Sequence, residues 1–142
     1  MNSPALSPEV QAFSQGFPLT LLHAGLTILL LVAGAAVYAL LTPHKELSLV
    51  RAGNTAAAVS FGGVLVGLAI PLAVSLGAST SLLEIGVWGV STIVVQLFVF
   101  RIADLVLRGL PRRIAAGETA AATLLVAAKL AVAVILAAAV AG

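Results

Sequence analysis

Residues 118–141 read ETAAATLLVAAKLAVAVILAAAVA, and this stretch decides the fold class of the chain. After Glu118 it holds one charged residue, Lys129, among 23 positions. A helix rises 1.5 Å per residue, so the run can cross the roughly 30 Å hydrocarbon core of a bilayer. We expect a membrane-spanning helix that begins at Glu118, whose carboxylate suits the positive end of a helix dipole, and ends at about Ala141.

The composition of the whole chain is that of a membrane protein. Of the 142 residues 61% are hydrophobic and 8% are charged, and the mean hydropathy is +1.20. Soluble domains carry about a quarter charged residues. Four apolar runs of spanning length leave room for one bundle and no separate soluble domain. We therefore predict an all-α membrane protein with four transmembrane helices in one domain over residues 1–142.

Local signals set the limits of the four spans, which we expect at about residues 20–41, 54–76, 82–101 and 118–141. Pro43 disfavours helical geometry in the residue before it, so it should end the first span. Asn54 can cap the second span, and Pro71 should bend it. The spacing of Arg101, Asp104 and Arg108 suggests that the third helix continues into water until Pro111.

Six of the seven basic residues lie in two loops and indicate the topology. They are Lys45 and Arg51 between the first two spans, and Arg101, Arg108, Arg112 and Arg113 between the last two. Cytoplasmic loops of membrane proteins carry an excess of Lys and Arg. We expect both loops in the cytoplasm and both termini outside, with Tyr38 and Trp88 at the two membrane interfaces.

A short segment recurs in the chain and suggests an internal duplication. Gly53-Asn54-Thr55-Ala56-Ala57-Ala58 is matched by Gly117-Glu118-Thr119-Ala120-Ala121-Ala122, and each copy opens a span. We interpret this as two tandem helical hairpins, over about residues 18–77 and 82–141, related by an axis along the membrane normal. Chance similarity between alanine-rich helix starts is the alternative.

Several motifs together carry a resemblance that runs through all four spans. They are Thr42-Pro43-His44-Lys45-Glu46, Gly53-Asn54-Thr55-Ala56-Ala57, Ile70-Pro71, Trp88-Gly89, Gln96-Leu97 with Phe100, and Thr119-Ala120-Ala121. In their order and spacing the chain resembles the YjfL family of bacterial inner-membrane proteins, the domain of unknown function 350. The resemblance implies a four-span protein of the bacterial inner membrane and no established activity. Glu118 and Leu136 depart from it, because the family leads us to expect Asn at both positions.

Lys129 is the first candidate for a functional residue. It lies about ten residues into the last span, roughly 15 Å from its start, so we place it near the bilayer midplane. A lysine there costs about 2.5–3.5 kcal/mol on insertion scales and should face the bundle interior, a subunit interface or a wet cavity. It either lines a pathway for an anion or a proton, or it is a structural residue held by carbonyls, Ser60, Gln96 or another subunit.

Other polar residues have a simpler interpretation beside a functional one. Gln96 can form a hydrogen bond between helices without any ligand. Asn54 and Glu118 are most simply helix caps, and a symmetric ion or substrate site at the repeat axis is the alternative. The cluster Arg101, Arg108, Arg112 and Arg113 could contact anionic lipid or a cytoplasmic protein, although topology alone accounts for it.

Small residues indicate close helix packing on two spans. Gly63 and Gly67 form one small-residue surface, and Ala127 and Ala131 form another. Such surfaces let helix backbones approach closely, inside one bundle or between copies of it. We expect a homo-oligomer.

The sequence assembles no catalytic or metal site, and we expect no cofactor. His23 and His44 lie at opposite ends of the first span, about 30 Å apart, so they cannot share a metal within one protomer. We expect no two ionisable groups at one depth in the membrane. The chain has no cysteine, and its basic residues flank apolar helices, which argues against nucleic-acid binding.

These observations lead to two hypotheses about function. The first is a non-enzymatic, self-associating membrane component that serves envelope physiology in the bacterial inner membrane. The alternative is a channel or transporter subunit that uses Lys129 in an anion or proton pathway.

Overall fold

The computed structural model describes residues 6–142, and these residues form helices joined by short links. The helices are α1 (Pro8–Leu41), α2 (Glu46–Arg51), α3 (Thr55–Ala78), α4 (Leu82–Val106), α5 (Leu110–Ala115) and α6 (Thr119–Ala141). Four of them, α1, α3, α4 and α6, are long and apolar enough to cross a membrane. The predicted all-α fold class with four spans is confirmed.

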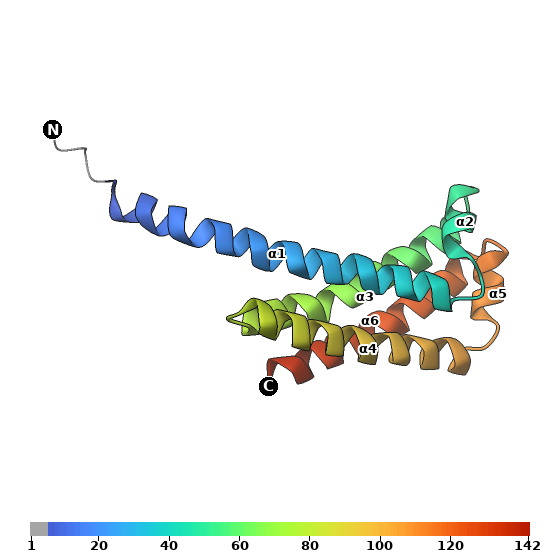
Figure 1. The fold of residues 1–142 in the computed structure, drawn as a ribbon. Coiled ribbons are helices and arrows are strands. Elements are labelled where there is room, and N and C mark those ends of the chain that lie inside the picture. Colours follow the sequence, from blue (N-terminus) through green and yellow to red (C-terminus); the bar gives the residue numbers. More distant parts are fainter. Residues whose placement is uncertain (1–5) are drawn as a thin grey trace.

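The four long helices lie alongside one another, and the two short helices lie together at one end (Figure 1). The start of α1 and the end of α6 lie toward the other end. Helices α3 and α6 make the most extensive contact, while α1 packs against α3 and α4. Segments from both halves of the chain therefore share one core.

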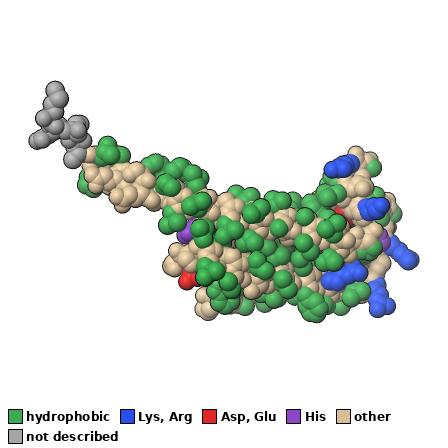
Figure 2. Space-filling view, in the orientation of Figure 1, with side chains coloured by type: hydrophobic (Ala, Val, Ile, Leu, Met, Phe, Trp, Pro, Cys, Tyr) green, Lys and Arg blue, Asp and Glu red, His purple; other side chains and the backbone are tan. Residues whose placement is uncertain are grey.

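Lys and Arg side chains gather at the end of the bundle that carries α2 and α5, which we call the basic end (Figure 2). They are the residues of the two predicted cytoplasmic loops: Lys45, Arg51, Arg101, Arg108, Arg112 and Arg113. Between this end and the opposite one the surface is mainly hydrophobic. Such a surface suits a lipid environment.

Each short helix ends in the same backbone motif. After α2, the N–H of Gly53 donates to Val50 O and the N–H of Asn54 donates to Leu49 O. Gly53 has φ +87°, a left-handed conformation that glycine adopts without a steric penalty. This pair of bonds is the Schellman motif, which satisfies the last carbonyls of a helix.

The motif recurs 64 positions later, after α5. Gly117, with φ +92°, donates to Ile114 O, and Glu118 donates to Arg113 O. Glu118 then precedes α6 as Asn54 precedes α3. The two connections thus have the same backbone geometry at positions that match in the sequence.

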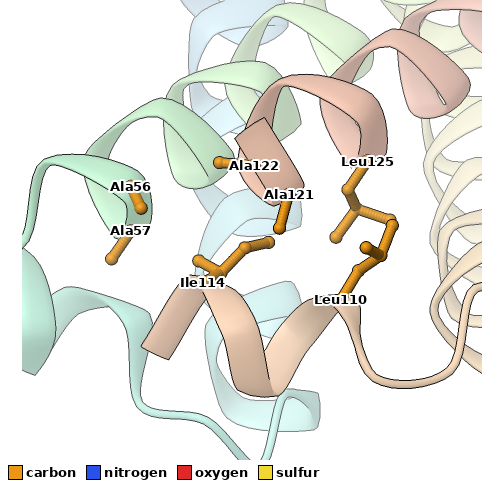
Figure 3. Packing of buried hydrophobic residues seen from close by; sticks show 7 residues of the cluster. All are labelled: Ala56, Ala57, Leu110, Ile114, Ala121, Ala122 and Leu125. Atoms are coloured by element: carbon orange, nitrogen blue, oxygen red, sulfur yellow. The ribbon is translucent and has the colours of Figure 1, made fainter. Parts of the chain in front are cut away.

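A small apolar cluster fixes α5 against the beginnings of α3 and α6 (Figure 3). Its buried members are Ala56, Ala57, Leu110, Ile114, Ala121, Ala122 and Leu125. The alanines leave room for the larger side chains of α5, so the short helix closes the basic end of the bundle.

The first helix begins earlier than the sequence indicated, at Pro8 instead of Thr20. Ser7 caps it, with Oγ 3.5 Å from the N–H of Val10, and Pro8 occupies the first turn, where a missing N–H has no cost. Pro18 lies inside the helix, where this part of the surface is exposed. The 34 residues of α1 span about 51 Å, so the helix extends past the other spans (Figure 1).

The third predicted span also ends differently. Helix α4 continues past Arg101, as expected, but ends at Val106 and not at Pro111. Gly109, with φ +93°, reverses the chain, and Pro111 lies in the first turn of α5. Proline is favoured at that position because it lacks a donor that the turn would leave unpaired.

The four predicted packing residues divide into two pairs. Gly63 and Gly67 are buried inside the bundle, where a side chain on Gly63 would collide with Val126. Ala127 and Ala131 are exposed on α6. The first pair packs within the protomer, and the second faces outward.

Candidate functional site

Lys129 is buried inside the bundle, with 1% of its surface exposed. Its Nζ forms an ion pair with Oδ1 of Asp104 at 2.8 Å, and the Asp104 side chain is 10% exposed. Helix α6 supplies the lysine and α4 supplies the aspartate. The cation is therefore compensated within the protomer.

Tyr38 is the second partner of Lys129. The ammonium group donates to the Tyr38 hydroxyl oxygen at 3.0 Å, and the hydroxyl in turn donates to Oε1 of Glu46 at 3.3 Å. Tyr38 lies on α1 and is 4% exposed. The phenol, which we expected among the aromatic residues of a membrane interface, points into the core, where its hydroxyl has two partners.

Glu46 and Ser60 extend this network to α2 and α3. The Ser60 hydroxyl, which is buried, donates to the same Oε1 of Glu46 at 3.4 Å. The five side chains, which we call the Lys129 cluster, come from α1, α2, α3, α4 and α6. They are Tyr38, Glu46, Ser60, Asp104 and Lys129. Polar contacts thus join all four spans and one short helix near the basic end.

Aromatic rings complete the surroundings of the ammonium group. Nζ lies 4.9 Å from the centroid of the Tyr38 ring and 5.4 Å from that of Phe100. A cation over an aromatic face is attracted by the ring quadrupole. Phe100 is fully buried and packs edge-on against Tyr38. The lysine is thus held by one carboxylate, one hydroxyl and two rings.

The pairing of Lys129 with Asp104 corrects the prediction that no two ionisable groups share a depth. Side chains on a helix point toward its N-terminus, and the N-terminus of α6 lies at the basic end, beside α5 (Figure 1). The long lysine side chain therefore carries Nζ from its Cα toward that end. Asp104 lies two residues before the end of α4 and meets it there. Counting Cα positions alone therefore misses the pair.

Glu46 lies outside the spans, on α2, and its environment acts on its protonation. Burial raises the pKa of the Glu46 carboxyl, because it disfavours the charged form. The positive charge of Lys129 and the hydrogen bond from Tyr38 oppose that effect. The other oxygen, Oε2, is buried and has no partner among the described residues. The carboxyl can thus bind a proton more readily than a solvated glutamate.

A cavity of about 390 Å³ opens beside the cluster at the basic end. Its walls come from the α1–α2 link, α2, α4, the α4–α5 link, α5 and α6. The lining residues are Thr42, Pro43, His44, Glu46, Arg101, Asp104, Arg108, Gly109, Pro111, Arg112 and Leu125. Two members of the Lys129 cluster, Glu46 and Asp104, therefore belong to the cavity wall, while Lys129 lies behind Asp104.

Gln96 is not part of this cluster. It lies on the buried face of α4, one turn from Phe100, and is 0% exposed. Neither its Oε1 nor its Nε2 has a hydrogen-bond partner among residues 6–142. Neither Gln96 nor Ser60, the two candidate side-chain partners from the sequence, forms a hydrogen bond with the Lys129 ammonium group. Ser60 reaches only Glu46.

Asn54 and Glu118 occupy matching positions and have different contacts. The Asn54 side chain accepts a hydrogen bond from Ala57 N at 3.0 Å and donates to the carbonyls of Ile114 and Ala115. Asn54 thus caps α3 and fastens it to α5. The side chain of Glu118 makes no capping bond and is 46% exposed. Glu118 thus occupies the N-cap position of α6, as expected, but its side chain neither caps the helix nor is buried.

The four arginines of the second basic loop have two different environments. Arg113 pairs with Glu118 on the surface, with a 2.7 Å bond from Nε to Oε2. This contact raises the pKa of the Arg113 guanidinium. Arg101, Arg108 and Arg112 line the cavity instead. Sequence spacing could not reveal this division, because it depends on the reversal of the chain at Gly109.

Within the described part of the chain, no group of three or more His, Cys, Asp or Glu side chains could hold a metal ion. His44 lines the cavity, whereas His23 lies within α1. The ionisable groups of the site are the Lys129 ammonium group, the carboxyl groups of Asp104 and Glu46, and the Tyr38 phenol.

Comparison with known proteins gives the family of the chain. A model of the family described as Domain of Unknown Function (DUF350) matches residues 12–140. Two relatives, both described as UPF0719 inner membrane protein YjfL, come from Escherichia coli strain K12 and Escherichia coli O157:H7. Each is 36% identical over 85 residues, which cover 60% of this chain and 64% of the relative. No solved structure matches the chain significantly. Because the family model covers nearly its whole length, this chain belongs to the DUF350 family.

Proposed function

We propose that the protein is a non-enzymatic component of the bacterial inner membrane that associates with copies of itself. The single observation that carries self-association is the outward position of Ala127 and Ala131 on α6. The buried face of the same helix is formed by other residues, Leu125 and Lys129 among them. A small-residue surface on a membrane helix lets a second helix approach closely.

In this proposal the Lys129 cluster is structural. The ion pair with Asp104 and the hydrogen bond to Tyr38 satisfy the lysine without a substrate. The cluster ties α1, α4 and α6 together at the basic end, so its role is to fix the arrangement of the spans. A catalytic role is not part of the proposal.

The orientation and the duplication belong to the same proposal. Positively charged loops favour the cytoplasmic side, so we place the basic end in the cytoplasm and both termini outside. The matched Schellman motifs after α2 and α5 support two tandem hairpins, because the same backbone bonds recur 64 positions apart. Reporter fusions at the C-terminus that locate it in the cytoplasm would contradict the orientation.

Native mass spectrometry in lipid nanodiscs tests self-association. We expect the wild-type chain to form oligomers and Ala131→Leu to shift the population toward monomers, because the larger side chain prevents close approach. Val95→Leu, on the exposed surface of α4, is the matched control and should keep the wild-type distribution. A wild-type protein that stays monomeric would overturn the proposal.

One observation favours the alternative of a channel or transporter subunit. Asp104 both pairs with Lys129 and lines the cavity at the basic end, so solute entering the cavity could reach the ion pair. Flux assays in proteoliposomes separate the two functions. Ion flux by the wild type that Lys129→Ala abolishes would favour transport, and reaction of the Lys129→Cys variant with aqueous thiol reagents would support it.

A further inference from the structure

Three arginines around the cavity at the basic end have no carboxylate partner among the described residues, although Nε of Arg108 donates to the Leu105 carbonyl at 3.2 Å. Arg101 lies on α4, Arg108 follows α4 and Arg112 lies on α5, and all three are exposed. The salt bridges among residues 6–142 involve other basic residues, Arg113 and Lys129. The guanidinium groups of the cavity therefore have no carboxylate within 4.0 Å in the described chain.

The charge around the cavity is positive even when its acidic residues are included. Asp104 is paired with Lys129 behind the wall, and Glu46 is the second carboxyl. The positive groups are Arg101, Arg108 and Arg112 in the wall and Lys129 behind it. Against the two carboxyl groups they leave an excess of two positive charges, and this excess increases if Glu46 binds a proton. Guanidinium groups bind phosphate through paired hydrogen bonds. The charge thus complements a phosphate group.

An apolar groove of about 310 Å³ adjoins this cavity at Arg101 and is formed by α4 and the last residue of α1. It is lined by Leu41, Val94, Leu97, Phe98 and Arg101. Arg101 lines both the groove and the cavity, and Leu41 in the groove is followed in the chain by Thr42 in the cavity wall. A polar compartment at the basic end thus leads into an apolar one along the spans.

We propose that the cavity and the groove together bind one anionic phospholipid, with its phosphate among Arg101, Arg108 and Arg112 and an acyl chain along Val94, Leu97 and Phe98. The order of the two compartments matches the order of a head group and a chain in a bilayer. A phosphate free in solution would use only the cavity. The groove, and its position on the lipid-facing side of α4, therefore favour a lipid.

The proposal is tested by titrating the purified full-length protein with phosphatidylglycerol or with phosphatidylcholine of the same chains. Bound lipid is counted by native mass spectrometry. We expect phosphatidylglycerol to bind about tenfold more tightly, because only it leaves the phosphate charge uncompensated. Equal binding of the two lipids would overturn the proposal.

Variants locate the site. Arg101→Gln and Arg112→Gln, on different helices, should each weaken phosphatidylglycerol binding roughly tenfold. Arg51→Gln removes the same charge at the same end of the bundle but outside the cavity, so it should change binding less than about twofold. If Arg51→Gln weakens binding as much as both cavity variants, the attraction is a general surface effect and the site is refuted.

The groove is tested separately from the phosphate. Val94→Trp should fill the groove and weaken binding of phosphatidylglycerol, and glycerol 3-phosphate at equal concentration should fail to displace the lipid. If Val94→Trp binds the lipid like the wild type, or if glycerol 3-phosphate competes equally well, the occupant is a soluble phosphate and the lipid proposal is wrong. Circular dichroism of each variant verifies its helical fold.

Discussion

Replacing Asp104 by Asn should destabilise the bundle by about 3–5 kcal/mol, the cost of leaving a buried charge without its partner. Nζ of Lys129 lies 2.8 Å from Oδ1 of Asp104 and close to the rings of Tyr38 and Phe100, and the lysine is 1% exposed, so little water is available to replace the lost carboxylate. Reversible unfolding by dodecyl sulfate in mixed micelles, followed by circular dichroism, measures the change in free energy.

Two comparisons make this result specific. Glu84→Gln neutralises an exposed carboxylate on the same helix, and we expect it to change stability by less than about 1 kcal/mol. The double variant Asp104→Asn/Lys129→Met should recover most of the lost stability, because it removes the uncompensated charge. If Asp104→Asn unfolds like the wild type, Asp104 does not hold Lys129 in the membrane.

Gly63→Ala should destabilise the protein by about 1–3 kcal/mol, the usual cost of adding volume to a packed core. A Cβ at Gly63 would lie 3.0 Å from the Cβ of Val126 and would collide with its methyl groups. Valine is stiff at χ1, so it cannot turn away without strain. The substitution therefore weakens the packing of α3 against α6, which is the most extensive helix contact in the bundle.

The adjacent Gly62 provides the matched control in the same unfolding experiment. A Cβ there meets nothing within 4 Å, so Gly62→Ala gains the same helix propensity without a clash. We expect it to be neutral or to stabilise the protein by up to about 1 kcal/mol. Val126→Ala should partly restore the stability of Gly63→Ala. Equal effects at positions 62 and 63 would show that α3 and α6 do not approach as described.

The four spans could be predicted from the sequence because a membrane imposes length and composition together. The start of α3 was predictable as well, since Asn54 is a favoured capping residue and its side chain accepts from Ala57 N. The start of α1 was not predictable, because polar and apolar residues alternate irregularly before Thr20. The helix in this segment has Ser7 as its N-cap and begins at Pro8. Apolar content alone does not report where a helix begins.

The short helices were missed, although the sequence contains signals for them. Gly109 followed by Pro111 is a turn with proline in the first helical positions, and Glu46 and Arg51 place opposite charges at the proper ends of α2. Each helix is only six residues long, too short for its apolar spacing to distinguish it from a loop.

The partners of Lys129 could not be identified from its position along the helix. The sequence singled out Lys129 and required a partner for it, but it could not name Asp104. That pairing depends on the direction of a long side chain and on the stagger between α4 and α6, neither of which is encoded in residue counts. Tyr38 and Glu46 come from still more distant segments. Tyr38 reaches the lysine from α1, and Glu46 on α2 joins the network through the Tyr38 hydroxyl.

Solid-state nuclear magnetic resonance of the protein in lipid bilayers tests the internal compensation of Lys129 most directly. Asp104 is the only aspartate in the chain, and Lys45→Arg leaves Lys129 as the only lysine. Dipolar recoupling between ¹⁵Nζ-labelled lysine and ¹³Cγ-labelled aspartate therefore reports one pair of atoms. With Nζ 2.8 Å from Oδ1, we predict strong dephasing of the Asp104 signal. A signal that does not dephase would place the two charges apart and contradict the account.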